Sequence, residues 1–169
     1  LGDVYKRQTS SNEGTTWATP KQLSITGDFN SVIFANGRFV ALGSNGNVAV
    51  STDNGGAWKV SKPFNTEYWR GVAYGNGKFV AVQSGGGLAT VSTSTDGVTW
   101  TTAKQVGEVS NNWQGIAFGN GKFIVVGSSG YYSTSTDGDT WSTPTQIKNE
   151  TGSTVSVYLL SLIHISEPT

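Results

Sequence analysis

The chain has 169 residues, and its 11 basic residues balance 11 acidic ones, which gives a formal net charge of zero at pH 7. Without a basic tract, the sequence gives no support to nucleic acid or an anionic membrane as a partner. The absence of cysteine excludes disulfides and thiolate metal sites. The 23 glycines, among many serine, threonine and aromatic residues, are typical of short strands joined by tight turns.

The two ends of the chain are related at the level of DNA. One choice of codons for Leu1–Gln8, read as its reverse complement, encodes LSLIHISE, which is the sequence of Leu160–Glu167. We therefore interpret residues 1–8 and 160–169 as non-native segments that resemble translated sequencing-adapter sequence, and we expect the fold in residues 9–159. The apolar run at 157–165 is too short to span a bilayer, so the sequence predicts no membrane insertion.

From residue 9 onward, the sequence alternates two kinds of segment. A degenerate turn string, SSNEGTTW, ends at Trp17. An apolar segment with a central Asn-Gly pair follows at 31–43 and returns at 71–83 and 115–127. Each apolar segment is followed by a more polar strand and then by a turn string, which reads STDNGGAW at 51–58, STDGVTW at 94–100 and STDGDTW at 135–141. The chain is thus built from copies of one unit.

The Asn-Gly pairs predict tight hairpins, because both residues tolerate the positive φ that a two-residue type I′ turn requires. We expect these turns at Asn36-Gly37, Asn76-Gly77 and Asn120-Gly121. The flanking segments are nearly continuous in apolar residues, which indicates strands covered on both faces. A fourth strand is expected to begin at the tryptophan that closes each turn string.

The spacing of the closing tryptophans predicts the architecture. Trp17, Trp58, Trp100 and Trp141 are 41, 42 and 41 residues apart. A period near forty residues, built from strands and turns, is the signature of propeller blades. The sequence therefore predicts an all-β fold, a β-propeller fragment of four-stranded antiparallel blades. Complete blades are expected at 28–66, 67–110 and 111–151, partial ones at 9–27 and 152–159, and the remaining blades of a parent protein as neighbours.

The turn strings carry a resemblance to a known family. The pattern S-x-D-x-G-x-x-W, complete in STDNGGAW, resembles the Asp-box, or BNR repeat. Asp-box propellers include sialidases and non-enzymatic propellers of phage tail fibres and secreted bacterial surface proteins. The longer pattern in this chain, an Asn-Gly hairpin segment followed by the box, resembles the non-enzymatic group. In these families the box is a structural element. The corresponding residues here are Ser51, Asp53, Gly55, Trp58, Ser94, Asp96, Gly97, Trp100, Ser135, Asp137, Gly138 and Trp141.

Elementary chemistry gives each box the same structural role. The aspartate can accept hydrogen bonds from backbone N–H groups ahead of it, the glycine supplies a permissive backbone, and the tryptophan folds back as an apolar plug worth roughly 3–5 kcal/mol. Asn12 takes the aspartate position in the first copy and can make the same turn, but it could not do acid chemistry. Since an active site needs one acid rather than one in each of three boxes, we predict no catalytic residue in the boxes.

A fragment of a sialidase-type glycosidase is the main alternative. That mechanism needs several arginines to clamp the substrate carboxylate, a Tyr–Glu nucleophile pair and an acid/base carboxylate. Residues 9–159 hold only Arg38, which we interpret as an exposed hairpin charge, and Arg70. Glu67 and Tyr68 are adjacent on an extended segment and point in opposite directions. No histidine or cysteine lies between residues 9 and 159, and DGD at 137–139 lacks the ligands of a calcium loop, so no metal and no cofactor are predicted.

An aromatic residue followed by a polar one precedes each expected innermost strand. We hypothesise that these residues contribute to a glycan or receptor surface, since sugar rings stack on aromatic faces while their hydroxyls need polar partners. The alternative is that the aromatic rings wedge between adjacent blades. The residues are Trp69, Arg70, Trp113 and Gln114, with Phe29 and Asn30 at the same position of the first unit.

The sequence therefore favours a non-catalytic recognition or structural module that binds a glycan or a cell-surface receptor. The resemblance implies a setting in a phage fibre or a bacterial surface or secreted protein, and thus outside the cell, at a cell surface or on a virion. A sialidase fragment is one alternative, and a scaffold propeller that assists the assembly of a protein complex is another.

Overall fold

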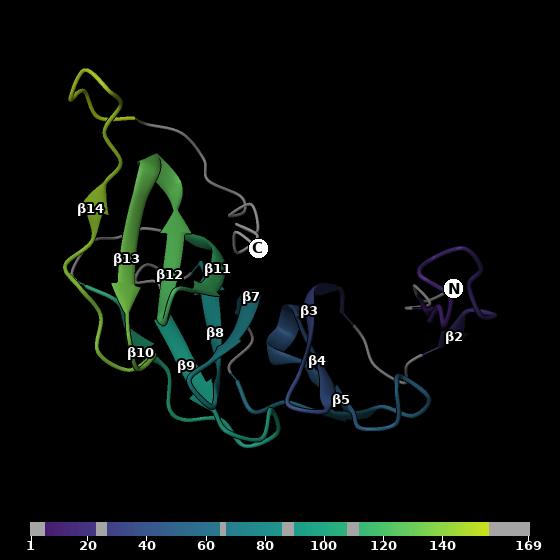
Figure 1. Cartoon of the computed structure of the whole chain (residues 1–169). Helices are drawn as coiled ribbons and strands as arrows, with labels where there is room; N and C mark the ends of the chain where they lie inside the picture. The colour runs from purple at the N-terminus through teal and green to yellow at the C-terminus, as the bar shows by residue number, and fades with distance from the viewer. Residues whose placement is uncertain (1–5, 23–26, 65–66, 86–89, 108–111, 156–169) are drawn as a thin grey trace.

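A computed structural model describes residues 6–22, 27–64, 67–85, 90–107 and 112–155, and almost all of its regular structure is β (Figure 1). Three four-stranded antiparallel sheets follow one another along the chain, each formed by four consecutive strands. The all-β prediction and the prediction of three complete four-stranded units are confirmed. In the part of the chain that the structure describes, no helix has the length and apolar character needed to cross a membrane.

Each sheet, which we call a blade, is a simple meander. The first blade contains β3 (Phe29–Ala35), β4 (Arg38–Gly43), β5 (Val48–Ser51) and β6 (Lys59–Ser61). The second contains β7 (Tyr68–Gly75), β8 (Lys78–Ser84), β9 (Thr90–Ser94) and β10 (Lys104–Gln105). The third contains β11 (Trp113–Gly119), β12 (Lys122–Gly127), β13 (Tyr131–Ser135) and β14 (Thr145–Gln146). The fourth strand of each blade begins after the closing tryptophan rather than at it, which corrects the sequence expectation.

The first two strands of each blade form the tight hairpin that the Asn-Gly pairs predict. Asn76 and Gly77 have φ of 47° and 78°, and the pairs at 36–37 and 120–121 have similar values. These left-handed conformations belong to the type I′ turn and suit asparagine and glycine. The hairpins set the register, with Gly75 opposite Lys78 in the second blade.

The blades pack against each other through two apolar cores. One core lies between the first and second blades and contains Leu42, Trp69 and Phe79, and the other lies between the second and third and contains Val82, Trp113 and Phe123. The innermost strands β3, β7 and β11 lie in order across the middle of Figure 1. Burial along β8 is continuous because a blade covers each side of it, whereas β3 alternates between half-buried and exposed residues.

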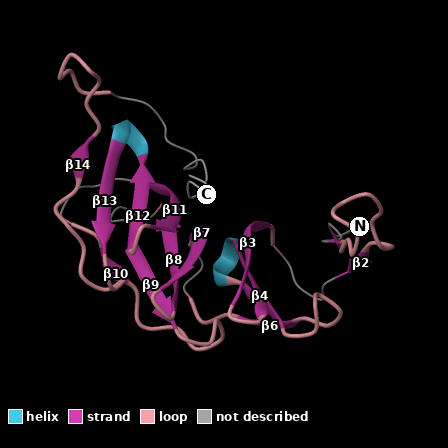
Figure 2. Cartoon of the chain, in the orientation of Figure 1, coloured by secondary structure: helices cyan, strands magenta, loops and turns pink. Residues whose placement is uncertain are grey.

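Two short 3-10 turns join the second and third strands of the first and third blades (cyan in Figure 2). They span Ser44–Gly46 and Ser128–Gly130, and their central residues, Asn45 and Ser129, have φ of 59° and 57°. Each is a single turn that reverses the chain.

A two-stranded pair precedes the first blade. Strand β1 (Lys6–Arg7) pairs with β2 (Lys21–Gln22), and the pairing of Arg7 with Lys21 repeats the register in which Val91 pairs with Lys104. The pair thus corresponds to the third and fourth strands of a blade, and it includes two residues that precede residue 9, where the fold was expected to begin. At the other end, Thr154 forms an isolated bridge with Lys148, and the rest of the predicted trailing strand, 156–159, lies outside the described residues.

Candidate functional site

The turn strings fold into hydrogen-bonded turns, which we call box turns. In the second one, the Ser94 hydroxyl donates to Oδ1 of Asp96 at 2.9 Å and accepts the N–H of Gly97 at 2.8 Å. The same carboxylate oxygen accepts the N–H groups of Val98 and Thr99 at 2.8 and 2.7 Å. The third turn repeats these four bonds.

The closing tryptophan completes each of the three full box turns. The indole N–H of Trp100 donates to the carbonyl oxygen of Gly97 at 3.0 Å, and Trp58 and Trp141 make the same bond at 3.1 Å. All three indoles are half-buried. The predicted plugs therefore carry a polar anchor that the sequence analysis did not anticipate.

The charge on the box aspartates stabilises the turns. Partial burial works to raise the pKa of Asp96, but the N–H groups of Thr99 and Val98 outweigh it and hold that pKa at about 2. The backbone N–H of Thr140 lowers the pKa of Asp137 in the same way. These carboxyl groups are ionised at neutral pH, where they have no proton to give to a leaving group.

The degenerate first copy forms the same turn without a charge. Oδ1 of Asn12 accepts the N–H of Thr16 at 2.9 Å, and the Ser10 hydroxyl accepts the N–H of Gly14 at 2.9 Å. The turn therefore depends on a side-chain oxygen at this position rather than on an acid. Trp17, which closes this copy, is 60% exposed.

Adjacent blades are tied together at the box turns by the basic residue of the hairpin. Arg38 Nη1 donates to the carbonyl oxygen of Asp96 in the next blade at 2.7 Å. Lys78 Nζ does the same for Asp137 at 3.2 Å and forms an ion pair with Asp139 at 2.7 Å. The interpretation of Arg38 as an exposed turn charge was wrong, because its acceptor is a backbone carbonyl 58 residues away.

The predicted binding residues stand at a β-bulge that recurs at the start of each innermost strand. The register shifts between Phe29 and Ser31, between Trp69 and Gly71, and between Trp113 and Gly115. A bulged residue has no partner on the neighbouring strand, and its side chain points in a different direction from that of a residue in a regular strand. The bulged residues are Asn30, Arg70 and Gln114, and we call this row the bulge edge.

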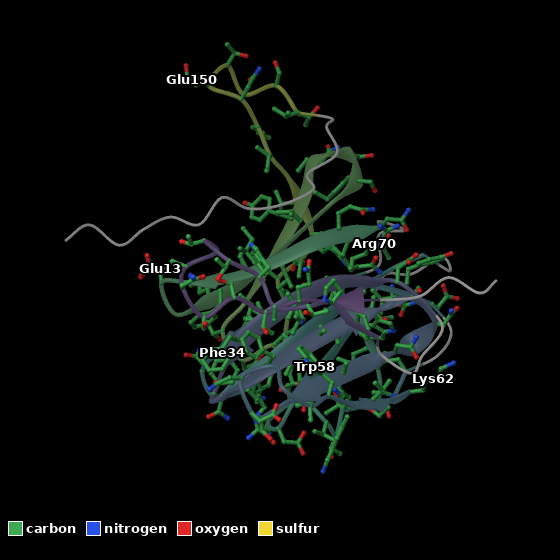
Figure 3. All side chains as sticks on the ribbon, turned by 90° about the vertical axis from the view of Figure 1, so that its right-hand side faces the viewer. Glu13, Phe34, Trp58, Lys62, Arg70 and Glu150 are labelled. Carbon is green, nitrogen blue, oxygen red and sulfur yellow. The ribbon has the colours of Figure 1, made fainter. Side chains whose placement is uncertain are left out.

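The polar side chains of the bulge edge connect neighbouring blades or face solvent. Asn30 Nδ2 donates to the carbonyl oxygen of Trp69 at 3.1 Å, and Gln114 Nε2 donates to Ser84 Oγ at 3.2 Å. Arg70 is exposed, and its guanidinium carbon lies 5.7 Å from the ring centre of Tyr68, which is itself 55% exposed. In Figure 3, Arg70 and Phe34 lie on opposite sides of the view. Arg70 and Tyr68 are therefore exposed on the surface that the described residues form.

The aromatic residues of the predicted surface lie inside the molecule. Trp69 and Trp113 have no exposed surface, and Trp69 stacks on Phe64 with ring centres 3.8 Å apart. Phe29 is half-buried. The two indoles sit in the inter-blade cores, as the wedge alternative states, so their faces are covered and cannot stack on a sugar ring.

The groups that a sialidase-type mechanism needs are not brought together in the described residues. Arg38 lies at the hairpin end of the first blade, whereas Arg70 lies near the opposite end of its own innermost strand, about 17 Å from the hairpin end of that strand at ~3.3 Å per residue. Among the residues that the structure describes, no group of three or more His, Cys, Asp or Glu side chains could hold a metal ion.

The stacked four-stranded sheets define the class of protein, because they are the blades of a β-propeller. No family model matches the chain. No curated protein matches it either.

Solved structures of low sequence identity share the fold. A structure of YCF48 bound to a D1 peptide has a TM-score of 0.62 at 23% identity, over 89% of this chain and 49% of that one. YCF48 from Cyanidioschyzon merolae has a TM-score of 0.59 at 16% identity, over 71% of this chain and 38% of its own. NanB with Optactamide has a TM-score of 0.61 at 18% identity, over 80% of this chain and 27% of its own. The chain spans less than half the length of each, and at these identities the likeness shows the fold alone.

Proposed function

We propose that the chain is a non-catalytic recognition module from an Asp-box propeller, and that it binds a segment of a protein partner at the bulge edge. The observation that carries the proposal is the exposed Arg70 over the exposed ring of Tyr68. Tyrosine and arginine are enriched where protein interfaces draw their binding energy. Together they offer an apolar ring and a cation that pairs with a carboxylate.

The bulge supports this assignment because it leaves the side chain of Arg70 outside the strand pairing while the residues before it stay paired. Arg70 lies outside the strand pairing, while Tyr68 and Trp69 before it pair with Ser84 and Gln83. The side chain of Arg70, which would contact the partner, is thus held on a rigid inner strand rather than on a loop. Such placement limits the entropy lost on binding.

Protein is favoured over glycan because the aromatic platforms predicted for sugars, Trp69 and Trp113, are covered. The structure of YCF48 bound to a D1 peptide gives an example of a peptide complex in a protein of this fold. The chain would then serve as a receptor-binding or assembly module. A place on a phage fibre or a bacterial surface protein follows from the Asp-box resemblance and belongs to the same proposal.

The test is a selection of displayed random peptides on the folded chain, run beside a glycan array. We expect the enriched peptides to carry an acidic residue and to lose at least tenfold in affinity on Arg70→Ala or Tyr68→Ala. Lys59→Ala is the matched control, since Lys59 is an exposed cation on the outermost strand β6. Peptides that bind Arg70→Ala unchanged, or glycan binding that depends on Arg70 without any peptide binding, would overturn the proposal.

A further inference from the structure

The hairpin tips of the first two blades carry the same two residues in the same turn. Asn36 and Asn76 have φ of 49° and 47°, and the glycines after them, Gly37 and Gly77, have φ of 70° and 78°. A methyl group built on either glycine meets no described atom within 4 Å. Each of these blades is followed by another described blade, so the two tips can be compared directly.

Both asparagines are exposed to solvent. Asn76 belongs to the second blade, which packs against a described blade on each side. Its exposure shows that a hairpin tip stays on the surface when both neighbouring blades are in place. The exposure of Asn36 is therefore a property of the tip and does not depend on an open face of the first blade.

The two tips differ in the hydrogen bonds of their carboxamides. Asn76 Nδ2 donates to the carbonyl oxygen of Thr136 at 2.8 Å and to that of Gly121 at 3.3 Å, both in the third blade. The backbone carbonyl oxygen of Asn36 accepts a bond of 3.4 Å from Arg38 Nε, but its side chain makes no hydrogen bond to any residue that the structure describes. One carboxamide is held by the next blade, and the other is free to rotate.

An asparagine that precedes a glycine can lose its side-chain amide without an enzyme. The backbone nitrogen of the glycine gives up its proton to hydroxide and attacks Cγ of the asparagine. The new C–N bond closes a five-membered succinimide, while the Cγ–Nδ2 bond breaks and the amide takes a proton and leaves as ammonia. Water then opens the ring at one of its two carbonyls, which yields aspartate or isoaspartate. Glycine favours this reaction because it has no Cβ to obstruct the approach.

Ring closure requires the carboxamide carbon to turn toward the backbone nitrogen of the next residue. At Asn76 this rotation breaks two hydrogen bonds to the third blade, whereas at Asn36 it breaks none to a described residue. The net contribution of one hydrogen bond corresponds to about tenfold in a rate. We propose that Asn36 is a site of spontaneous deamidation, and that the junction with the third blade protects Asn76 from the same reaction.

The products at position 36 act on the first inter-blade junction. Aspartate places a carboxylate near Arg38, whose guanidinium donates across the junction to the carbonyl oxygen of Asp96. Isoaspartate also adds a carbon atom to the main chain of the two-residue loop that sets Ala35 opposite Arg38. Either product draws the guanidinium away from its acceptor. Deamidation at this position therefore loosens the first junction and leaves the second intact.

The experiment incubates the folded full chain at pH 8 in water enriched in heavy oxygen, so that only sites hydrolysed during the incubation carry the label. Peptide mapping by mass spectrometry follows positions 36 and 76 separately. We expect Asn36 to convert about tenfold faster than Asn76. In guanidinium chloride at the same pH the two rates should converge, because both asparagines precede glycine and the protecting bonds are gone.

The matched control is Asn36→Gln, in which the corresponding ring would have six members and forms far more slowly. The aged parent chain should unfold at a lower urea midpoint than the fresh chain, and Asn36→Gln should lose less over the same time. Equal rates at Asn36 and Asn76 in the folded chain, or a difference that persists in guanidinium chloride, would overturn the proposal. An equal loss of midpoint in the aged parent and in aged Asn36→Gln would overturn the effect on the first junction.

Discussion

The guanidinium of Arg38 donates a hydrogen bond of 2.7 Å to the backbone carbonyl oxygen of Asp96, which lies 58 residues further along the chain. This bond joins the hairpin of one blade to the box turn of the next. Lys78 makes the same connection to Asp137 one blade later. The box turn therefore also contributes to packing between blades, because its backbone carbonyl accepts a hydrogen bond from the arginine or lysine of the preceding blade.

Replacement of this cation should loosen the junction. We expect Arg38→Ala to lower the free energy of unfolding by about 1–2 kcal/mol, since a charge-assisted bond to a partly buried carbonyl is lost. Arg38→Lys should retain most of the stability, because Lys78 makes the same contact. The control is Lys122→Ala, at the same position of the third blade, where the described residues offer no box turn; it should change stability by less than about 0.5 kcal/mol. Urea unfolding measures all three, and equal losses at 38 and 122 would contradict the junction bond.

The box aspartate should make the fold sensitive to acid. The pKa of Asp96 is about 2 in the folded chain, below its ordinary value of 3.8. Its ionised form thus contributes stability that is complete above pH 4–5 and is lost as the pH falls toward 2. Asp96→Asn should keep the turn, as Asn12 does, with a loss below about 1 kcal/mol at pH 7 and a shallower decline in acid. Urea midpoints between pH 2 and 6 test this, and parallel curves for the two proteins would refute it.

The two buried indoles should behave as core residues. Trp69→Ala should cost roughly 3–5 kcal/mol, because it empties a site in which Phe64 stacks on the indole. Arg70→Ala, at the adjacent exposed position, should change stability by less than about 0.5 kcal/mol. Thermal and urea unfolding separate these outcomes. A Trp69→Ala variant with the same Tm as the parent chain would contradict the burial of Trp69 in the core.

The close approach of the second and third blades gives a sharp test of their packing. A methyl group built on Gly75 would overlap the ring of Phe118, whereas one built on Gly119 meets no described atom within 4 Å. We expect Gly75→Ala to destabilise the chain by about 1–3 kcal/mol through overpacking. Gly119→Ala, at the same position of the third blade, should be neutral. Equal unfolding free energies for the two variants would show that the blades are not stacked as described.

The sequence predicted the elements whose causes are local. The Asn-Gly pairs dictate their own backbone conformation, and the spacing of Trp58, Trp100 and Trp141 reports one unit per tryptophan. The side-chain oxygen of Asn12 likewise predicts its turn without any knowledge of the rest of the fold. The Asn-Gly turns and the Asn12 turn were confirmed because each depends on residues a few positions apart.

The sequence could not decide features that depend on a neighbouring blade. An aromatic residue before an inner strand fits a sugar platform and an inter-blade wedge equally well, and only the burial of Trp69 and Trp113 in the structure distinguishes them. The acceptor of Arg38 is a backbone carbonyl, which no residue type signals. The bulge did leave a signal that was missed: a polar residue between an aromatic residue and a glycine at Arg70 and Gln114.

The bulge also separates two kinds of constraint on the chain. Positions 30, 70 and 114 stand outside the cross-strand pairing and hold different side chains, a carboxamide at 30 and 114 and a guanidinium at 70. The residues on either side of each bulge pair with the neighbouring strand or pack into an inter-blade core. A substitution at one of these three positions would therefore leave the cross-strand hydrogen bonds of its blade in place, and at Arg70 it would also leave the inter-blade hydrogen bonds of Asn30 and Gln114 in place.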